Sequence, residues 1–212
     1  MTDIVLFLLQ GLWTTAVITI GSFLIGAVLG VPVALARLSD VPVLRWAATA
    51  YVEVLRGIPP IAWMLVLFYG LSRWVQIEPV VAACLALGAV ATAYLAENYR
   101  AGIRSVAQGQ WEGADALGMG SRDTFWRVIA PQGIGVALPP SAGFAVGLLK
   151  DSAVASVIGV SDIAFQALML NQQGNAGLPI FLGAGLVYLL ISVPIAVGAR
   201  RLDAAVRVRS AV

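Results

Sequence analysis

Long runs without a charged residue constrain this chain more than any other feature. One such run lies between Asp3 and Arg37, and another lies between Asp162 and Arg200. Because charged side chains are expensive in hydrocarbon and about 20 apolar residues cross a bilayer, these runs predict membrane spans. We expect an all-α membrane protein with about five transmembrane helices, over residues 12–35, 47–72, 79–99, 128–149 and 178–199.

Polar segments interrupt both of these runs. The dipeptide Gln10-Gly11 predicts a short interfacial piece before the first span. The stretch Asn171-Gln172-Gln173-Gly174-Asn175 reads as a polar loop before the last span. Two long connections remain, one over about 97–127 and one over about 150–177. No internal repeat or linker is evident, so the sequence predicts a single domain over 1–212.

Composition excludes several functional classes. Only 11% of the residues are charged, against about 25% in a soluble domain. The chain has no His and one Cys, which rules out a His/Cys zinc site and a Ser-His-Asp triad. A net charge of +2 provides no surface for nucleic-acid phosphates. We therefore predict no catalytic residue, no metal site, no cofactor held by this chain and no nucleic-acid partner, but a lipid bilayer around it.

The distribution of positive charge predicts the orientation. Basic residues favour cytoplasmic loops, and five spans place the two ends on opposite sides of the membrane. With the N-terminus outside, ten of the 13 basic residues fall on the inner side and only Arg73 and Lys150 fall on the outer side. The ten are Arg37, Arg45, Arg100, Arg104, Arg122, Arg127, Arg200, Arg201, Arg207 and Arg209. We therefore expect the N-terminus outside and the C-terminus in the cytoplasm.

The long inner connection contains a helical pattern. Trp111, Ala114 and Leu117 follow one another at intervals of three residues, and Gly118 suits a helix C-terminus. The pattern predicts a short amphipathic helix around residues 110–118. This helix either lies flat on the bilayer or docks onto a cytoplasmic partner.

Two charges fall within the second predicted span. Glu53 and Arg56 are three residues apart, so they share a helix face and can form an ion pair. Gly57 and Pro59 follow and predict a break or kink, which often marks a translocation site. A zwitterion would match a pair of opposite charges. The alternative is that the pair only fixes packing or caps the kink.

The fourth span ends at Lys150, the only lysine in the chain. It is predicted to be either an interfacial anchor or part of a gate at the outer mouth. Small residues four apart favour close helix packing. They occur as Gly143 and Gly147 in this span and as Gly26 and Gly30 in the first, for contacts within one subunit or between two.

Several spaced motifs resemble one known family. Glu112, Ala114 and Gly118 resemble the glutamate-alanine-alanine signature of integral-membrane permease subunits of ABC importers. Gly113 stands where the family usually has Ala, which lowers helix propensity by up to about 1 kcal/mol. Further segments resemble the polar amino-acid branch, although Ala153 replaces a usual hydroxyl: Gln10-Gly11-Leu12, Tyr51-Val52-Glu53-Val54-Leu55-Arg56-Gly57-Ile58-Pro59, Glu97-Asn98-Tyr99-Arg100, Gly109-Gln110, Pro131-Gln132 and Lys150-Asp151-Ser152.

The resemblance implies roles for these segments. The chain would be the type I importer-like transmembrane domain of an importer in a bacterial inner membrane. Coupling to the ATPase would fall to Gly109, Glu112, Ala114, Leu117 and Gly118. A translocation path would be lined by Glu53, Arg56, Gly57 and Pro59. An outer gate or corner would be formed by Lys150, Asp151 and Ser152.

The resemblance also implies partners and a substrate class. It predicts two copies of a cytoplasmic ABC ATPase that bind ATP-Mg, a second permease (identical or paralogous) and an extracytoplasmic binding protein. The substrate would be an amino acid or a related small polar zwitterion. The chain has no P-loop motif, so it is predicted to be a transport subunit and not itself an enzyme. The rivals are a stand-alone secondary transporter or channel protomer driven by an ion gradient, and a non-transporting scaffold.

Overall fold

The structure is a computed structural model that describes residues 2–72, 74–174 and 177–210. Within these ranges all regular elements are helices, and the expected all-α class is confirmed. Arg73 and Asn175, which were assigned to connections from the sequence, lie outside the described residues. The elements are α1 (Thr2–Leu9), α2 (Leu12–Leu38), α3 (Pro42–Gly57), α4 (Pro60–Leu65), η1 (Val66–Gly70), α5 (Pro79–Arg104), α6 (Gln108–Ala116), α7 (Ser121–Thr124), η2 (Phe125–Ile129), α8 (Ala130–Asp151), η3 (Ser152–Ile158), α9 (Ile163–Gln172) and α10 (Gly177–Ser210).

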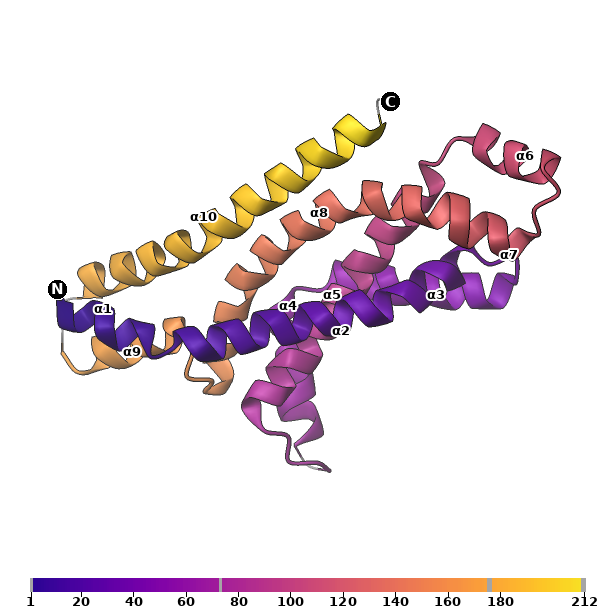
Figure 1. The fold of residues 1–212 in the computed structure, drawn as a ribbon. Coiled ribbons are helices and arrows are strands. Elements are labelled where there is room, and N and C mark those ends of the chain that lie inside the picture. Colours follow the sequence, from indigo (N-terminus) through magenta and orange to yellow (C-terminus); the bar gives the residue numbers. More distant parts are fainter. Residues whose placement is uncertain (1, 73, 175–176, 211–212) are drawn as a thin grey trace.

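Four helical stretches among the described residues are long and apolar enough to cross a membrane, and one bent pair brings the number to five. The four are Ile4–Leu38, Pro79–Arg104, Ser121–Ile158 and Gly177–Arg201. They match the predicted first, third, fourth and fifth spans, and most extend further than predicted (Figure 1). A helix can extend past its apolar, membrane-spanning part, so charged turns such as the one around Arg104 lengthen the helices at their ends. The side on which each terminus lies stays a prediction.

The second predicted span, over residues 47–72, begins earlier than predicted and is broken after Gly57, where the sequence predicted a break or kink. Pro42–Gly57 and Pro60–Gly70 meet at 103°. Ile58 has extended dihedral angles because a residue before proline is excluded from the α region, and Pro59 is extended as well. Neither Pro59 nor Pro60 can donate a backbone hydrogen bond, so both prolines weaken a helix at the position where this one breaks.

The most extensive helix packing among the described residues joins the first span to the third. A Cβ on Gly26 would lie 2.6 Å from the Cβ of Ala91, and one on Gly30 would lie 3.1 Å from the backbone nitrogen of Ala96. The predicted close packing of this glycine pair therefore occurs within the subunit, between α2 and α5. A Cβ added to Gly143 or Gly147 would have no atom within 4 Å, so this second pair packs against nothing in the described chain.

The predicted outer connection over 150–177 is largely helical, which corrects the expectation of a loop. It consists of η3 and α9, and Gly159 joins them with φ +84°, a conformation that favours glycine. At the end of the molecule that carries the N-terminus, α9 lies beside α1 and the start of α10 (Figure 1). Gly11, at the predicted break of the first run, packs directly against the backbone of Asp162 and Ile163, where a side chain has no room.

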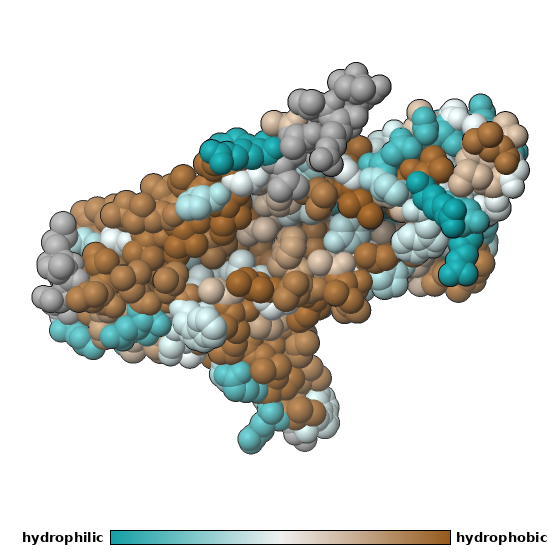
Figure 2. All heavy atoms as spheres, viewed as in Figure 1, coloured by the Kyte–Doolittle hydropathy of each residue, from teal (hydrophilic) through white to brown (hydrophobic). Residues whose placement is uncertain are grey.

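The surface separates apolar and polar residues along the molecule. Figure 2 shows hydrophobic residues over most of the body and hydrophilic residues gathered at the end that carries α6 and at other extremities. Large apolar side chains such as Leu24, Val28 and Leu190 are more than half exposed along the spans. An apolar surface of this extent suits hydrocarbon and not water.

Candidate functional site

The predicted amphipathic helix is present as α6 and ends at a well-defined cap. The backbone N–H of Gly118 donates to the carbonyl of Asp115 (2.8 Å), and that of Met119 donates to the carbonyl of Ala114 (3.1 Å). Gly118 has φ +72°. These two bonds and a left-handed glycine form a Schellman motif, which satisfies carbonyls that a helix end leaves free. Helix α6 therefore has a fixed end, as the position of Gly118 predicted.

A side-chain hydrogen bond ties α6 to the fourth span. The Nε2 of Gln132 donates to Oε1 of Gln110 (3.1 Å) and to the carbonyl of Val128 (2.9 Å). Gln110 lies in α6, whereas Gln132 lies in the first turn of α8. This contact joins two motifs that are separate in the sequence, and it gives a movement of α6 a direct connection to a membrane span.

The five predicted coupling residues divide into two groups. Ala114 is buried, so it holds α6 against the protein and does not face outward. The exposed group is Gly109, Glu112, Leu117 and Gly118, and Leu117 is 82% exposed. These residues give α6 a free face with an apolar residue and a carboxylate.

A charged network joins three helices near the α6 end of the spans. The carboxylate of Glu97 in α5 accepts hydrogen bonds from Arg37 of α2 and from the Nε of Arg100 (3.0 Å). The Arg37 side chain, which is 10% exposed, also pairs with Glu53 of α3 at 3.7 Å. This network was not predicted from the sequence. Arg37 and Glu97 each end an uncharged run on the same predicted side, which was the available signal.

The predicted ion pair between Glu53 and Arg56 does not form. Glu53 turns to Arg37, and the Arg56 guanidinium lies 4.9 Å from the centre of the Tyr94 ring. Tyr94 is stacked on Phe144 of α8 with ring centres 4.9 Å apart. The i, i+3 spacing allowed the pair, but the ring of Tyr94 in α5 offers Arg56 a cation–π contact instead.

The residues around the break face the surface of the subunit. Glu53, Arg56, Gly57 and Pro59 are all exposed. The amide of Asn98, on the helix that carries Tyr94, donates to the hydroxyl of Ser141 in α8 (3.3 Å). The predicted path residues are thus exposed at the break, and one of them, Arg56, lies over the ring of Tyr94, which is stacked on Phe144.

The segment Lys150-Asp151-Ser152 marks the change from α8 to η3. Ser152 is buried, and its hydroxyl donates to the carbonyl of Leu149 (2.8 Å), which holds the backbone at this transition. Asp151 is half-buried and Lys150 is exposed. Helix α8 ends at Asp151, close to the predicted end of the span at residue 149, and the 3-10 helix η3 continues the helical backbone through Ile158.

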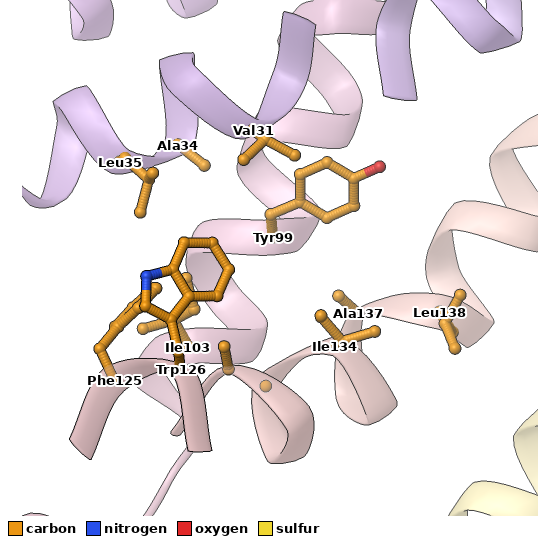
Figure 3. A pocket seen from close by; sticks show the side chains of 12 residues that line it. Val31, Ala34, Leu35, Tyr99, Ile103, Phe125, Trp126, Ile134, Ala137 and Leu138 are labelled. Atoms are coloured by element: carbon orange, nitrogen blue, oxygen red, sulfur yellow. The ribbon is translucent and has the colours of Figure 1, made fainter. Parts of the chain in front are cut away.

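Figure 3 shows an apolar cavity between α2, α5 and the η2–α8 segment. Its volume is about 270 Å³. Side chains such as Val31, Tyr99, Trp126 and Ile134 surround it, and the Tyr99 hydroxyl donates to the carbonyl of Ala27 (3.4 Å). A cavity with this lining offers no partner for the charges of a zwitterion, so it is not the substrate path.

A buried carboxyl group lies where α9 begins. Asp162 is fully buried and caps α9 by accepting a hydrogen bond from the N–H of Phe165 (2.8 Å), and the hydroxyl of Tyr188 donates to it (3.4 Å). Burial raises the pKa of Asp162 to about 6 despite these hydrogen bonds. The N–H of the next residue, Ile163, donates to Thr15 (3.4 Å). The cluster fixes α2, α9 and α10 together, which is a structural role.

Metal-ligating residues do not gather anywhere in the part of the chain that the structure describes. There is no group of three or more His, Cys, Asp or Glu side chains that could hold an ion. The polar features that remain are therefore the α6 tip, the exposed break and the charged network behind it.

The fold and these features define a multi-pass helical membrane protein with a capped helix protruding at one end. A family model described as "Binding-protein-dependent transport system inner membrane component" matches residues 22–208. The chain belongs to this family, and it is a permease subunit of an ABC importer.

Individual relatives agree with this assignment. The L-cystine transport system permease protein TcyB of Bacillus subtilis (strain 168) is 35% identical over 183 residues, which are 85% of this chain and 78% of TcyB. The probable amino-acid ABC transporter permease protein YckA of the same organism is 32% identical, over 87% of this chain and 82% of YckA. A crystal structure of an amino acid ABC transporter with histidines is 30% identical, with a TM-score of 0.89 over 94% of both chains.

Proposed function

We propose that this permease imports amino acids or related small polar zwitterions, delivered by an extracytoplasmic binding protein and driven by two cytoplasmic ABC ATPase subunits. The relatives named for cystine and other amino acids support the substrate class. The observation that carries the proposal is α6, a helix with a Schellman cap, an exposed tip and a side-chain tie to a membrane span.

In this proposal α6 is the coupling helix. Its free face presents Glu112 and Leu117 to a socket on an ATPase subunit. When ATP binding moves the ATPase, the capped helix moves as a rigid body and carries the start of α8 through the Gln110–Gln132 hydrogen bond. The ATPase holds ATP-Mg, since this chain has no P-loop.

The translocation path lies in this proposal along the surface exposed at the break of the second span. Glu53, Arg56, Gly57 and Pro59 face out of the subunit, and a charged arginine at membrane depth favours a wet path or a protein interface over lipid. A second permease, identical or paralogous, completes the wall of the path. The assembly resides in a bacterial inner membrane, as the family description supports.

The experiment that tests the proposal is co-purification of this chain with its ATPase, followed by reconstitution with candidate binding proteins and measurement of amino-acid uptake. We expect uptake that requires ATP and the binding protein. Glu112→Arg reverses the charge on the free face of α6 and is expected to abolish ATPase retention while the permease still inserts into the membrane.

Asp40→Arg is the matched control, because Asp40 is exposed in the connection between α2 and α3 and is equally a carboxylate. It is expected to retain the ATPase. Uptake driven by an ion gradient without ATP would establish the secondary-transporter alternative, and ATPase binding without any uptake would establish the scaffold. Normal uptake by Glu112→Arg would refute the docking role of α6.

A further inference from the structure

The apolar cavity between α2, α5 and the η2–α8 segment is a feature that the proposed function does not use (Figure 3). Close contacts on both sides of α5 shape it. A Cβ added to Gly102 of α5 would overlap the carbonyl oxygen of Gly133 in α8. A Cβ added to Gly30 of α2 would lie 3.2 Å from the ring of Tyr99 in α5. Helices α2 and α8 therefore both pack closely on α5, and about 270 Å³ remains open between them. We refer to this space as the α2–α8 cavity, with walls that include Val31, Leu35, Ile103, Trp126, Ile134 and Leu138.

The walls of the α2–α8 cavity favour a hydrocarbon ligand. Among the side chains that line it, only Tyr99 and Trp126 carry a polar atom, and the Tyr99 hydroxyl already donates to the carbonyl of Ala27 (3.4 Å). A buried water molecule makes about three hydrogen bonds, which these walls do not offer. A hydrocarbon chain needs no such partner and gains dispersion contacts with the walls.

The position of the cavity along the spans places it within one leaflet. Leu35 and Ile103 lie within three residues of the ends of their candidate spans, and Trp126 lies within five residues of the start of its span. From Ala130 to Leu138 the cavity follows α8 for about 12 Å at 1.5 Å per residue, which is less than half of a hydrocarbon core of about 30 Å. The cavity therefore lies in the leaflet on the α6 side and runs along the spans, as lipid chains do.

The cavity is open toward the apolar surface of the spans. Two of its wall residues, Trp126 and Ile134, are 55% and 53% exposed. Figure 3 shows the Trp126 indole extending from η2 toward Leu35 of α2. Tryptophan is typical of the level where hydrocarbon meets headgroups. An acyl chain of the surrounding bilayer thus reaches the cavity without crossing a polar surface.

Unpaired positive charges lie next to the cavity at its α6 end. Arg104 directly follows Ile103, and Arg122 lies about one helical turn before Trp126. Both arginines are exposed, and neither forms an ion pair with a carboxylate among the described residues. Arg127, by contrast, pairs with Asp123 at 3.2 Å. An apolar cavity beside two unpaired guanidinium groups matches a molecule with a hydrocarbon chain and an anionic head.

We propose that the α2–α8 cavity binds one acyl chain of an anionic phospholipid from the leaflet on the α6 side, with the headgroup phosphate as the counter-ion of Arg104 and Arg122. This inference goes beyond the proposed function and holds for any cargo. An identical second subunit matches the cavity less well, because its own α6 end carries the same cations.

The test is photolabelling of the permease–ATPase complex in phosphatidylcholine nanodiscs. The probe is phosphatidylglycerol with a diazirine in one acyl chain, added at increasing mole fraction, and peptide mass spectrometry locates the adducts. We expect adducts on Tyr99 or Ile103 that saturate as the probe increases, because a single site fills. Leu190 of α10, which is 63% exposed, is the internal control and is expected to gain adducts in proportion to the probe.

A variant that fills the cavity is expected to remove the saturable labelling. Ala130→Leu adds an isopropyl group at a buried wall position, whereas the control Ala47→Leu adds the same group at an exposed site of α3 and is expected to behave as the parent. If Ala130→Leu does not assemble, Ile134→Trp decides, because it narrows the cavity from its exposed edge. Its control is Ile20→Trp, at a site of α2 that is 59% exposed.

A second pair of variants tests the headgroup contact. Arg104→Gln is expected to raise the half-saturating mole fraction of the probe about fivefold. Arg45→Gln removes an exposed arginine of α3 and is expected to leave that fraction unchanged. Equal half-saturating fractions in the parent and in Arg104→Gln would overturn the contact with the anionic headgroup, and with it the proposal.

Three further outcomes would overturn the lipid site. The first is the absence of adducts on Tyr99 and Ile103, or adducts there that rise in proportion to the probe as they do on Leu190. The second is saturable labelling that remains unchanged in the variants that fill the cavity. The third is a disulfide between two permease subunits through Ile134→Cys in a Cys84→Ala background, because a second subunit would then cover the cavity.

Discussion

Two glycines in α6 and its cap give opposite predictions for the same substitution. Gly118 has φ +72°, so alanine there must adopt a left-handed conformation that costs about 1–2 kcal/mol. Gly113 lies inside the helix, has helical neighbours and has no atom within 4 Å of an added Cβ. Alanine at Gly113 therefore stabilises the helix by up to about 1 kcal/mol.

These energies translate into ATPase affinity because an ordered α6 is required for docking in the proposed function. Gly118→Ala strains the two hydrogen bonds of the Schellman motif and is expected to weaken ATPase binding by about five- to thirtyfold. Gly113→Ala is expected to strengthen it by up to about fivefold. Titration of the purified ATPase against the permease in nanodiscs measures both changes.

Hydrogen exchange of the α6 amides provides an independent readout in the permease alone. Protection of the α6 amides is expected to fall in Gly118→Ala and rise in Gly113→Ala. If both variants bind the ATPase like the parent while their α6 protection moves in opposite directions, α6 order does not control docking. If neither protection nor affinity changes, the energetics of the cap are wrong.

Two other substitutions test the packing of α2 against α5 and the pH dependence that Asp162 confers on stability. Gly26→Ala places a Cβ 2.6 Å from that of Ala91 and is expected to lower the stability of the protein by about 1–3 kcal/mol. In the control Gly198→Ala the added Cβ has no atom within 4 Å, so this variant is expected to be neutral or stabilising. A thermal unfolding midpoint of Gly26→Ala equal to that of the control would contradict the α2–α5 packing. Burial raises the pKa of Asp162 to about 6, so the folded protein binds a proton more tightly than the unfolded chain does between about pH 4 and pH 6. The free energy of unfolding is therefore expected to fall by up to about 3 kcal/mol as the pH rises through this window. Asp162→Asn keeps the helix cap and is expected to remove this decline in unfolding experiments from pH 4 to pH 7.5; an unchanged decline would assign it to another group.

Local features were predictable because a few neighbouring residues decide them. The end of α6 at Gly118 follows from a glycine after an amphipathic pattern, and the break of the second span was expected from Gly57 and Pro59 together. The predicted spans follow from the free energy of transferring charged residues into hydrocarbon. The lengths of the uncharged runs in the sequence are therefore enough to locate them. The 103° bend at the break did not follow, since the packing of α3 and α4 against α5 sets that angle.

The electrostatic partners were not predictable in the same way. Glu53 and Arg56 share a helix face, but Arg37 from α2 and Tyr94 from α5 approach them from elsewhere in the chain and replace their mutual contact. Spacing along one helix says which contacts are possible and not which distant helix competes for them.

The number of spans and the position of the α6 tip were readable from the order of residues, because hydrophobic runs and turn residues act over short distances. The class of protein followed from spaced motifs that resemble those of ABC-importer permeases. Helix packing was needed to establish that Glu97 accepts hydrogen bonds from Arg37 and Arg100, and that Arg56 lies over the ring of Tyr94. Most of these contacts join residues tens of positions apart. They exist only once the fold has fixed which faces of the spans meet.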